Sequence, residues 1–469
     1  MTEINKKQKK NINLNPFVLL FLVIAVCGIA SFFVTPGTFE REVIDGRTVV
    51  VPNSFHVLEK NPISVFDIFR AVPQGLIGSS SIIFLILIVG GAIEVFNKSG
   101  SLSMGVSKMI SKMGGKGDTL ILIVLMIIFA ILGGFLGWVE AAIPFAPIVV
   151  PIILELGFDS LTAVAVPILG LMIGFAVGPT NVYTIGVAHA IAELPLFSGF
   201  GLRFTAYLVF VTVAILHTVK YAVRVKKDPT KSYVADIDVS DLKIDFSKIE
   251  GKEMSGAQKL SLVILASTFA VVVYGMLKLS WTINDMSAAF LVAGIVVGFI
   301  CKMNAGDIAD TFIAGAKGSM GGALIVGIAS GVQWILETGG IIDPAINGLA
   351  NLLSGFPPIV SAIGIMIIVS LLNGLVPSRV GKAMALMPLL IPLGDIVGLT
   401  RQITTLAYQF GDAITNIFWF TFGSLLIFLS YGRVPLQRYY KFVIPLMVVL
   451  FIIAIIFLTI ATSIGYGPF

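Results

Sequence analysis

Long apolar stretches recur along the whole chain and are separated by short polar segments. The clearest are residues 16–35, 71–93, 119–138, 204–219, 260–277, 356–377 and 442–462, with shorter ones at 286–301 and 320–336. An apolar helix of about 20 residues is long enough to cross the hydrocarbon core of a bilayer. No soluble core could bury this many stretches. The pattern therefore predicts an all-α polytopic membrane protein with about 10–12 transmembrane helices.

The composition agrees with this pattern. Of the 469 residues, 57% are hydrophobic and 12% are charged, whereas soluble proteins carry about 25% charged residues. The net charge of +5 comes from lysines in the tails and loops, where basic residues orient helices. No basic stripe with interleaved aromatics indicates nucleic acid. We therefore expect a multi-pass protein of the cell membrane whose partners are the lipid bilayer and a small molecule.

The two halves of the chain share a spacing of glycine and proline. The spacings 14, 4 and 6 occur twice, 241 residues apart, in Gly133, Pro147, Pro151 and Gly157 and in Gly374, Pro388, Pro392 and Gly398. This repetition predicts an internal duplication. We expect a first transmembrane repeat at residues 1–225, a polar extramembrane linker at 226–253 and a second transmembrane repeat at 254–469.

Each repeat contains an apolar segment that is unsuited to a continuous helix. Residues 140–157 and 377–398 are too apolar for an aqueous loop, yet prolines interrupt them. Irregular backbone is tolerated in a membrane where protein or a wet cavity surrounds it, so we expect each segment to be a re-entrant helical hairpin. The next spans, 161–191 and 402–431, contain Gly178–Asn181 and Gly411-Asp412 and are expected to be broken helices. Duplicated halves with such interruptions are typical of secondary transporters.

The sequence leaves part of the topology unresolved. Lysines at residues 6–10 and 98–116 predict a cytoplasmic N-terminus. The apolar stretches and broken spans then give five crossings before the linker and six after it. This count brings both expected hairpins in from the outside, which contradicts inverted repeats. The helix count and the side of the linker therefore stay open.

Four charged residues lie in or beside these interrupted segments. Glu140 is the one charge between residues 119 and 154, and Asp412 is the one charge between 402 and 432. Charges at membrane depth usually face a cavity or a partner, but a hairpin tip near the interface would instead leave Glu140 solvated. Arg379 and Lys382 begin the second interrupted segment. They either bind a carboxylate or pair with one of the acids, or they extend to the interface.

Polar side chains lie at the expected helix breaks. Thr180, Asn181, Thr415 and Asn416 offer oxygens that either cap the broken helices or bind a substrate carboxylate or Na⁺. A Na⁺ site is expected near Asn181, Asp412 and Asn416. No phosphate-binding loop and no hydrolase motif is present. We therefore expect no enzyme activity and no organic cofactor, with energy from exchange or from a Na⁺ or H⁺ gradient.

Two stretches carry a resemblance to a known family. They are EAAIPFAPIVVPIILELGFDSLTAVAV and LTRQITTLAYQFGDAITNIF. In them the chain resembles the dicarboxylate anaerobic carrier family (YfcC/DcuC-like carriers) of the ion-transporter superfamily, and the resemblance extends over almost the whole chain. It implies two inverted repeats, two opposed hairpins and a site between hairpin tips and broken helices. The site residues that it implies are Glu140, Thr180, Asn181, Asp412, Thr415 and Asn416.

The chain departs from that family at both hairpins. The family has a small Gly/Ser-rich second tip with a Gln, where this chain has Ser378, Arg379 and Lys382. The first hairpin has the single acid Glu140, followed by Ala141 and Ala142, where relatives often have two acids. The expected binding residues therefore include Ser378, Arg379 and Lys382, and the expected site holds both signs of charge.

These features predict a secondary active transporter of a small carboxylate-bearing metabolite, either an antiporter or a Na⁺ or H⁺ symporter. A basic amino acid is favoured because the expected site is both acidic and basic, and a C4-dicarboxylate is the alternative within the same fold. An intramembrane enzyme would need a metal or nucleophile constellation, and a passive channel would not need two half-sites. The sequence leaves the oligomeric state open, with a homodimer as one candidate.

Overall fold

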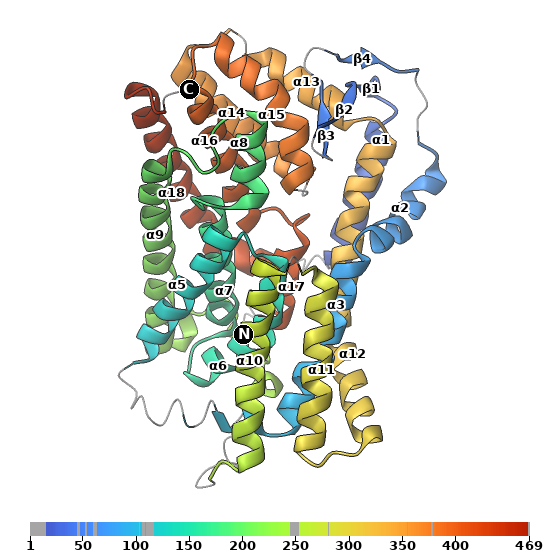
Figure 1. Ribbon diagram of the computed structural model, residues 1–469, viewed down its shortest axis with the longest axis vertical. Helices are drawn as coiled ribbons and strands as arrows, with labels where there is room; N and C mark the ends of the chain where they lie inside the picture. The colour runs from blue at the N-terminus through green and yellow to red at the C-terminus, as the bar shows by residue number, and fades with distance from the viewer. Residues whose placement is uncertain are drawn as a thin grey trace, which may run out of the picture.

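The computed structural model describes residues 16–44, 47–51, 54–59, 63–102, 104–105, 108, 117–243, 253–279, 281–353, 355–376 and 379–467. Helices make up most of this part (Figure 1). Two small antiparallel sheets, β1 with β4 and β2 with β3, lie at one end. The strands are β1 (Gly37–Thr38), β2 (Arg41–Ile44), β3 (Arg47–Val50) and β4 (His56–Val57). Six of the described helices are long and apolar enough to cross a membrane, which confirms the predicted class.

The helices form two bundles that lie side by side (Figure 1). The first, here the α12 bundle, contains α1 (Pro16–Ala30), α2 (Val65–Gly78), α3 (Ser80–Lys98), α10 (Gly256–Lys278), α11 (Ile283–Ile300) and α12 (Ala305–Thr338). Each repeat supplies three of these helices.

The second, here the hairpin bundle, holds the helices of both interrupted regions. It contains α5 (Asp118–Leu136), η1 (Glu140–Phe145), α6 (Ala146–Glu155), α7 (Ser160–Ala176), η2 (Val182–Gly186), α8 (Val187–Ile191), α9 (Phe200–Lys227), α13 (Ile342–Leu353), α14 (Pro358–Asn373), α15 (Arg379–Ile396), α16 (Arg401–Ile414), η6 (Thr415–Ile417), α17 (Gly423–Tyr431) and α18 (Leu436–Ser463). At its centre α7 and α16 are buried almost completely. A buried helix is normally apolar on every side, as α7 is. The buried polar residues of α16 are therefore exceptional and make it a candidate for part of a site.

The chain turns back twice to form helical hairpins. In hairpin 1, α5 leads into η1 and α6, and the Lys226 ammonium contacts both the Asp118 carboxylate and the Leu156 carbonyl. The start and the end of this hairpin therefore lie together, beside the end of α9. In hairpin 2, α14 leads into α15. A Cβ atom at Gly398 would lie 3.8 Å from the Pro358 ring, so its two ends also meet.

The two hairpins start from opposite ends of the molecule. Hairpin 1 starts at the end of α9 near Lys226, here called the linker end. Beyond hairpin 2, the Thr400 hydroxyl donates to the Tyr466 carbonyl at 2.7 Å, and the Tyr466 hydroxyl donates to the Gly199 carbonyl. Gly199 precedes the 28-residue helix α9. Hairpin 2 therefore starts at the opposite end, here called the strand end, where the sheets and α13 also lie (Figure 1).

The bounds of the expected hairpins were wrong. Residues 140–157 and 377–398 each contain one hairpin arm, η1 with α6 and then α15, and neither turns back on itself. The first arms are α5 and α14, within stretches 119–138 and 356–377 that were predicted to be crossings. An arm of this length is as apolar as a crossing helix, so hydropathy could not separate them. When stretches 119–138 and 356–377 are counted as hairpin arms and not as crossings, the two hairpins enter from opposite sides of the membrane, as inverted repeats require.

The second helix break was also misplaced. Gly411 and Asp412 lie inside α16, which continues to Ile414, and the irregular segment follows at residues 415–422. The first break, between α7 and η2, includes Gly178 and Thr180 as predicted.

Element lengths confirm the duplication. The pair α2 and α3 occupies residues 65–98, and α12 occupies the 34 residues that begin 240 positions later. Helices α9 and α18 both have 28 residues. The hairpins end at Gly157 and Gly398, whose φ angles are 82° and 79°, a left-handed conformation that favours glycine. The two repeats therefore share a fold in opposite orientations.

The described part of the linker region packs on the linker end. It includes η3 (Pro229–Lys231) and η4 (Ser240–Leu242). The Ser232 hydroxyl donates to Asp159 at 2.6 Å, and the Arg433 guanidinium donates to both carboxylate oxygens of Asp241 at 2.7 and 2.5 Å. The bonds from Arg433 lower the pKa of the Asp241 carboxyl below its ordinary value. Residues 244–252 of the expected linker lie outside the described residues.

Hairpin 1 depends on a close approach between α5 and α7. A Cβ atom at Gly174 would lie 2.3 Å from the Ala130 carbonyl oxygen. Gly174→Ala should therefore destabilise the protein by about 1–3 kcal/mol, because the two backbones must separate. The measurement is thermal unfolding of the purified protein in detergent. Gly201→Ala is the control, since a Cβ atom there meets nothing within 4 Å. Equal stability of both variants would contradict the packing argument.

Candidate functional site

An ion pair joins the tips of the two hairpins. Glu140 begins η1 at the tip of hairpin 1, and Arg379 begins α15 at the tip of hairpin 2. Arg379 Nη1 donates to Glu140 Oε2 at 2.7 Å, and Nη2 donates to Oε1 at 2.8 Å. A bidentate pair of this kind is the strongest hydrogen-bonded contact that a guanidinium and a carboxylate form. The Ser424 hydroxyl of α17 adds a bond to Glu140 Oε1 at 3.1 Å.

Aromatic rings hold the guanidinium in place. The Arg379 guanidinium carbon lies 4.8 Å from the ring centre of Phe175 and 5.1 Å from that of Phe422. Contacts of this kind attract a cation to the ring face. The side chains of Arg379 and Glu140 keep 14% and 22% of their surface exposed, and this surface faces a cavity.

That cavity, here the central cavity, has a volume of about 320 Å³ and lies between the two bundles. Its polar lining comes from both repeats: Ser79, Glu140, Tyr183, Ser330, Gln333, Arg379, Thr421 and Ser424. Ser79 separates α2 from α3, and its hydroxyl contacts that of Ser330 on α12. The start of α11 also reaches this level, because Ile283 lines the same cavity. Hairpin tips, a helix break and the α12 bundle therefore meet around one space.

A second ion pair is fully buried beside hairpin 2. Lys382 Nζ lies 2.6 Å from Asp412 Oδ1, and each side chain exposes 1% of its surface. The ammonium also donates to the Asn373 side-chain oxygen and, at 3.2 Å, to the Val376 carbonyl. The Asn373 amide donates onward to Thr415 Oγ1 at 2.9 Å and Asn416 Oδ1 at 2.8 Å. Four of the expected site residues therefore belong to one buried network.

Thr180 and Asn181 lie against hairpin 1 instead. The Thr180 hydroxyl donates to the Phe135 carbonyl at 3.3 Å, close to the hairpin tip. The Asn181 oxygen accepts from the Tyr183 amide at 3.0 Å, as a helix cap does, and its nitrogen donates to the Phe175 carbonyl at 3.4 Å. Each helix break therefore contacts the hairpin of its own repeat. The break between α7 and η2, here break 1, does so through Thr180. The irregular segment 415–422, here break 2, does so through Thr415 and Asn416, which accept from Asn373. Ser378 lies outside the described residues.

Sequence reasoning missed several residues of the site. Asn373 is the one amide side chain in the apolar stretch 356–377, which was a signal. Nothing in the sequence marks Ser424. The buried Arg203 donates to Gln402 at 3.0 Å and to Gln409 at 3.2 Å, and Gln409 donates to the Gly178 carbonyl at 2.8 Å. This network ties α9 and α16 to break 1.

Two further cavities follow α12 on either side of the central one. A cavity of about 530 Å³ lies toward the strand end, and another of about 590 Å³ lies toward the linker end. Gln333 lines both the strand-end and the central cavity. The linker-end cavity is lined by Gly318 and Gly322 of α12 and by Asp241 of the linker. The three spaces thus follow one face of α12 from end to end.

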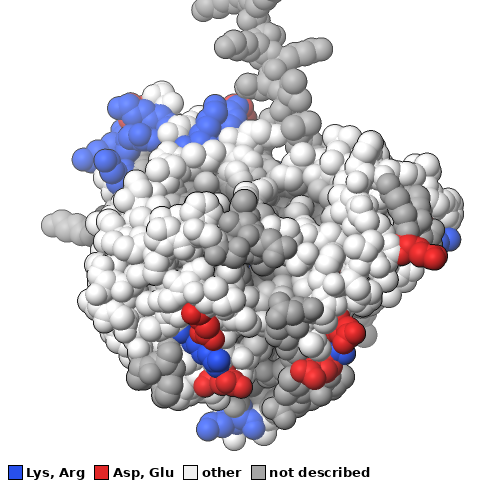
Figure 2. Space-filling model, turned by 90° about the horizontal axis from the view of Figure 1, so that it is seen from above, with Lys and Arg blue, Asp and Glu red and all other residues white. Residues whose placement is uncertain are grey.

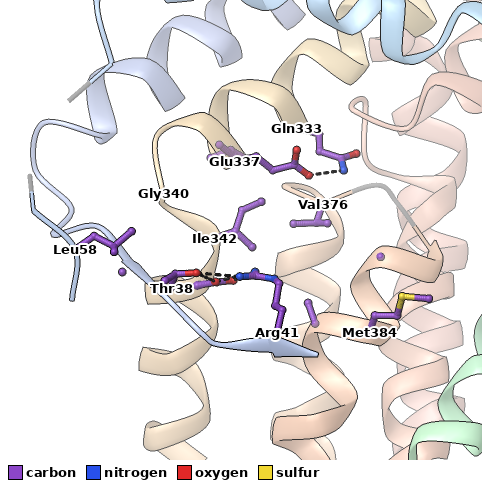
Figure 3. Close-up of a pocket in the computed structure, with 14 residues that line it drawn as sticks. Thr38, Arg41, Leu58, Gln333, Glu337, Gly340, Ile342, Val376 and Met384 are labelled. Carbon is purple, nitrogen blue, oxygen red and sulfur yellow. Dashed lines mark hydrogen bonds and ion pairs between the residues drawn. The ribbon is translucent and has the colours of Figure 1, made fainter. Parts of the chain in front are cut away.

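Figure 3 shows the strand-end cavity. Arg41, between the sheets and α13, forms an ion pair with Asp343 at 2.8 Å. Gln333 donates to Glu337 at 2.8 Å across one turn of α12. Among the described residues no cation lies within ion-pair distance of Glu337, so this cavity retains an acidic group. The described residues contain no cluster of three or more histidine, cysteine or acidic side chains suited to a metal.

Comparisons with known proteins identify the family of the chain. A family model described as "DcuC: C4-dicarboxylate anaerobic carrier" matches residues 15–463. A protein of Escherichia coli (strain K12) named "Putative basic amino acid antiporter YfcC" is 30% identical over 488 residues, with 96% of each chain covered. An uncharacterized protein of Haemophilus influenzae is 29% identical over 422 residues, with 89% of this chain and 82% of that one covered.

Two solved transporter structures match at the level of overall outline. The YdaH transporter of Alcanivorax borkumensis has a TM-score of 0.43, with 97% of this chain and 100% of that one covered. MtrF of Neisseria gonorrhoeae has a TM-score of 0.40, with 96% and 95% covered. Both are 15% identical to this chain. Likeness at this level carries no conclusion about the site.

The buried pair makes a prediction about stability. Asp412→Asn should destabilise the protein by roughly 3–5 kcal/mol, because it leaves the Lys382 ammonium buried without its counter-charge. Adding Lys382→Met should recover most of this loss, since the double variant buries no charge. Thermal unfolding in detergent measures both effects. Asp395→Asn is the control, because its side chain is 45% exposed and such pairs contribute at most about 1 kcal/mol. A double variant no more stable than Asp412→Asn would contradict the pairing.

Proposed function

This chain belongs to the C4-dicarboxylate anaerobic carrier family of membrane transporters, and we propose that it is a secondary active antiporter that exchanges basic amino acids. The observation that carries the proposal is the Glu140–Arg379 pair between the two hairpin tips. A zwitterion has groups for both partners, with its carboxylate on Arg379 and its amine on Glu140. It can therefore enter the pair without changing the net charge of the site.

The same pair favours exchange over net uptake. When substrate leaves, Glu140 and Arg379 satisfy each other and tie the two hairpins together. Reopening this pair without a ligand would expose two partly buried charges, which costs several kcal/mol. A second substrate offsets that cost, because it supplies both counter-charges. The carrier therefore changes conformation readily only when substrate is bound.

The preference for a basic side chain has separate support. The strand-end cavity retains the Glu337 carboxylate, and the linker-end cavity is lined by Glu94. A second amine or guanidinium on the substrate would be attracted to either approach. The name of the Escherichia coli relative points to the same substrate class.

A C4-dicarboxylate is the second candidate. The description of the family favours it, and so do the two cations of α15, Arg379 and Lys382. However, Asp412 neutralises Lys382 and Glu140 neutralises Arg379. A dianion would have to displace one of these acids into a buried space. The paired site is therefore better matched to a zwitterion.

We also infer that the linker end faces the cytoplasm. Lys98, Lys226, Arg433 and Arg438 lie at this end, as does the basic segment that ends α9. Positive charge on short loops marks the cytoplasmic side of a membrane protein. Figure 2 shows the strand end, where acidic and basic groups lie in small clusters next to each other. In this orientation the chain starts in the cytoplasm and the described C-terminal residues lie outside.

Exchange in proteoliposomes tests the proposed function. Vesicles preloaded with arginine or lysine should take up radiolabelled arginine, whereas empty vesicles should not. Glu140→Gln should lower this exchange at least 10-fold, because the substrate amine loses its counter-charge. Glu193→Gln, at a side chain that is 79% exposed, should leave exchange unchanged. Exchange of succinate or fumarate without competition from arginine would instead assign the dicarboxylate function.

Cysteine labelling in intact cells tests the orientation. Leu196→Cys lies in the exposed connection between α8 and α9, and Asp238→Cys lies in the described part of the linker region. Each is placed in a chain whose two native cysteines, Cys27 and Cys301, are replaced by alanine. A membrane-impermeant maleimide should label Leu196→Cys in intact cells and Asp238→Cys only after lysis. The reverse pattern would place the linker outside.

A further inference from the structure

The Lys382 ammonium lies in a cage of oxygen atoms. Its neighbours are the Asp412 carboxylate, the Asn373 side-chain oxygen and the Val376 carbonyl. Asp412 belongs to α16, Asn373 ends α14, and Val376 lies in the turn that follows α14. An ammonium has three N–H donors. Two of them have hydrogen-bond acceptors in Asn373 and Val376, and the Asp412 carboxylate supplies the counter-charge.

A cage of this composition is also suited to a small hard cation. Carboxylate, amide and main-chain carbonyl oxygens are the ligands that hard cations prefer. In secondary transporters, irregular backbone at the middle of the membrane coordinates coupling Na⁺ ions. The sequence pattern predicts Na⁺ near Asn181, Asp412 and Asn416 for this reason, and the structure places Asn181 apart from the other two, against hairpin 1. The ammonium has the charge of Na⁺ and lies beside Asp412.

The geometry at Asp412 shows how much depends on the lysine. Among the described residues, neither Asp412 oxygen accepts an aligned hydrogen bond from a neutral group, and the residue is completely buried. The close ammonium is therefore its main source of stabilisation. Without the lysine, Asp412 Oδ1 would face the vacated space beside the Asn373 and Val376 oxygens.

The described residues of the first repeat contain no such cage. At the corresponding displacement of 239–241 residues, Lys382 falls on the Ala-Ala-Ile segment 141–143 and Asp412 falls on the Leu-Met-Ile segment 171–173. The polar residues of break 1, Thr180 and Asn181, bond to main-chain groups around hairpin 1. The second repeat alone carries both the acid and the built-in cation.

We propose that Lys382 is a tethered replacement for a coupling cation, so that substrate binding and exchange need no Na⁺. The consequence for exchange rests on the proposed transport function, whereas the cation cage itself can be tested without any substrate. With the positive charge supplied by the chain, the hairpin keeps its counter-ion through the whole cycle. Exchange is then driven by the two substrates and not by a Na⁺ gradient.

Thermal unfolding in NaCl and in choline chloride tests the cage. The wild-type protein should unfold at the same temperature in both salts. Lys382→Ala should be destabilised in choline and recover with increasing Na⁺, by roughly 2–4 °C at saturation. Lys382→Ser, which leaves a hydroxyl in the cage, should respond in the same direction and replaces the alanine variant if that one fails to fold. Lys259→Ala, at an exposed lysine of α10, should show no response to Na⁺.

Two further measurements extend this test. Lys382→Ala combined with Asp412→Asn should lose the response to Na⁺, because the cage then lacks its acid. Arginine exchange by the wild type should proceed at the same rate with Na⁺ or choline on both sides. Stabilisation of the wild-type protein by Na⁺ would overturn the proposal, even if no variant folds. So would Lys382 variants whose stability depends on pH but not on Na⁺. A chain that exchanges dicarboxylates without Na⁺ would refute the proposed substrate and leave the cage intact.

Discussion

Placing four charges at the level of the hairpin tips imposes a constraint on the whole hairpin bundle. A single unpaired charge at this depth costs several kcal/mol, and irregular backbone must find all its hydrogen bonds within the protein. Both demands are met by contacts between different elements, one pair joining the two repeats and the other joining consecutive helices. Glu140 is paired with Arg379 across 239 residues, and Lys382 with Asp412 across 30. The opposed hairpins are the arrangement that brings the first pair together.

The fold is symmetric but its chemistry is not. Both repeats contribute a hairpin, a broken helix and a long final helix in opposite orientations. At matching tips, however, the first repeat has an acid and the second has a base. Break 1 is capped by main-chain contacts, whereas break 2 leads into the buried Lys382 network. Two identical half-sites would repel each other at the tips. An acid opposite a base instead joins the two halves at their hairpin tips and leaves this pair with no net charge.

The sequence predicted the fold class, the duplication and most of the candidate site, because glycine, proline and isolated charges are costly in apolar stretches unless the fold or the site requires them. It did not predict which segments turn back. Residues 118–136 are apolar enough to cross a membrane, and only the contact of Lys226 with both ends of hairpin 1 reveals the return. The pairing of the charges was equally hidden. Arg379 and Lys382 are three residues apart, and only the packing of α15 against η1 and α16 assigns each to its acid.

The cavities indicate which contacts must change during transport. Gln333 and the start of α15 separate the strand-end cavity from the central one. Gly423 and Ser424 of α17 line the central cavity, whereas Ile427 and Ser430 of the same helix line the linker-end cavity. The face of α12 common to all three is rich in glycine and serine, and a Cβ atom at Gly318 or Gly321 would meet nothing within 4 Å. Small side chains on a wall of this kind would not obstruct a movement of the hairpin bundle along it. The ion pair at the tips would then move with the site, because both of its partners belong to the hairpin bundle.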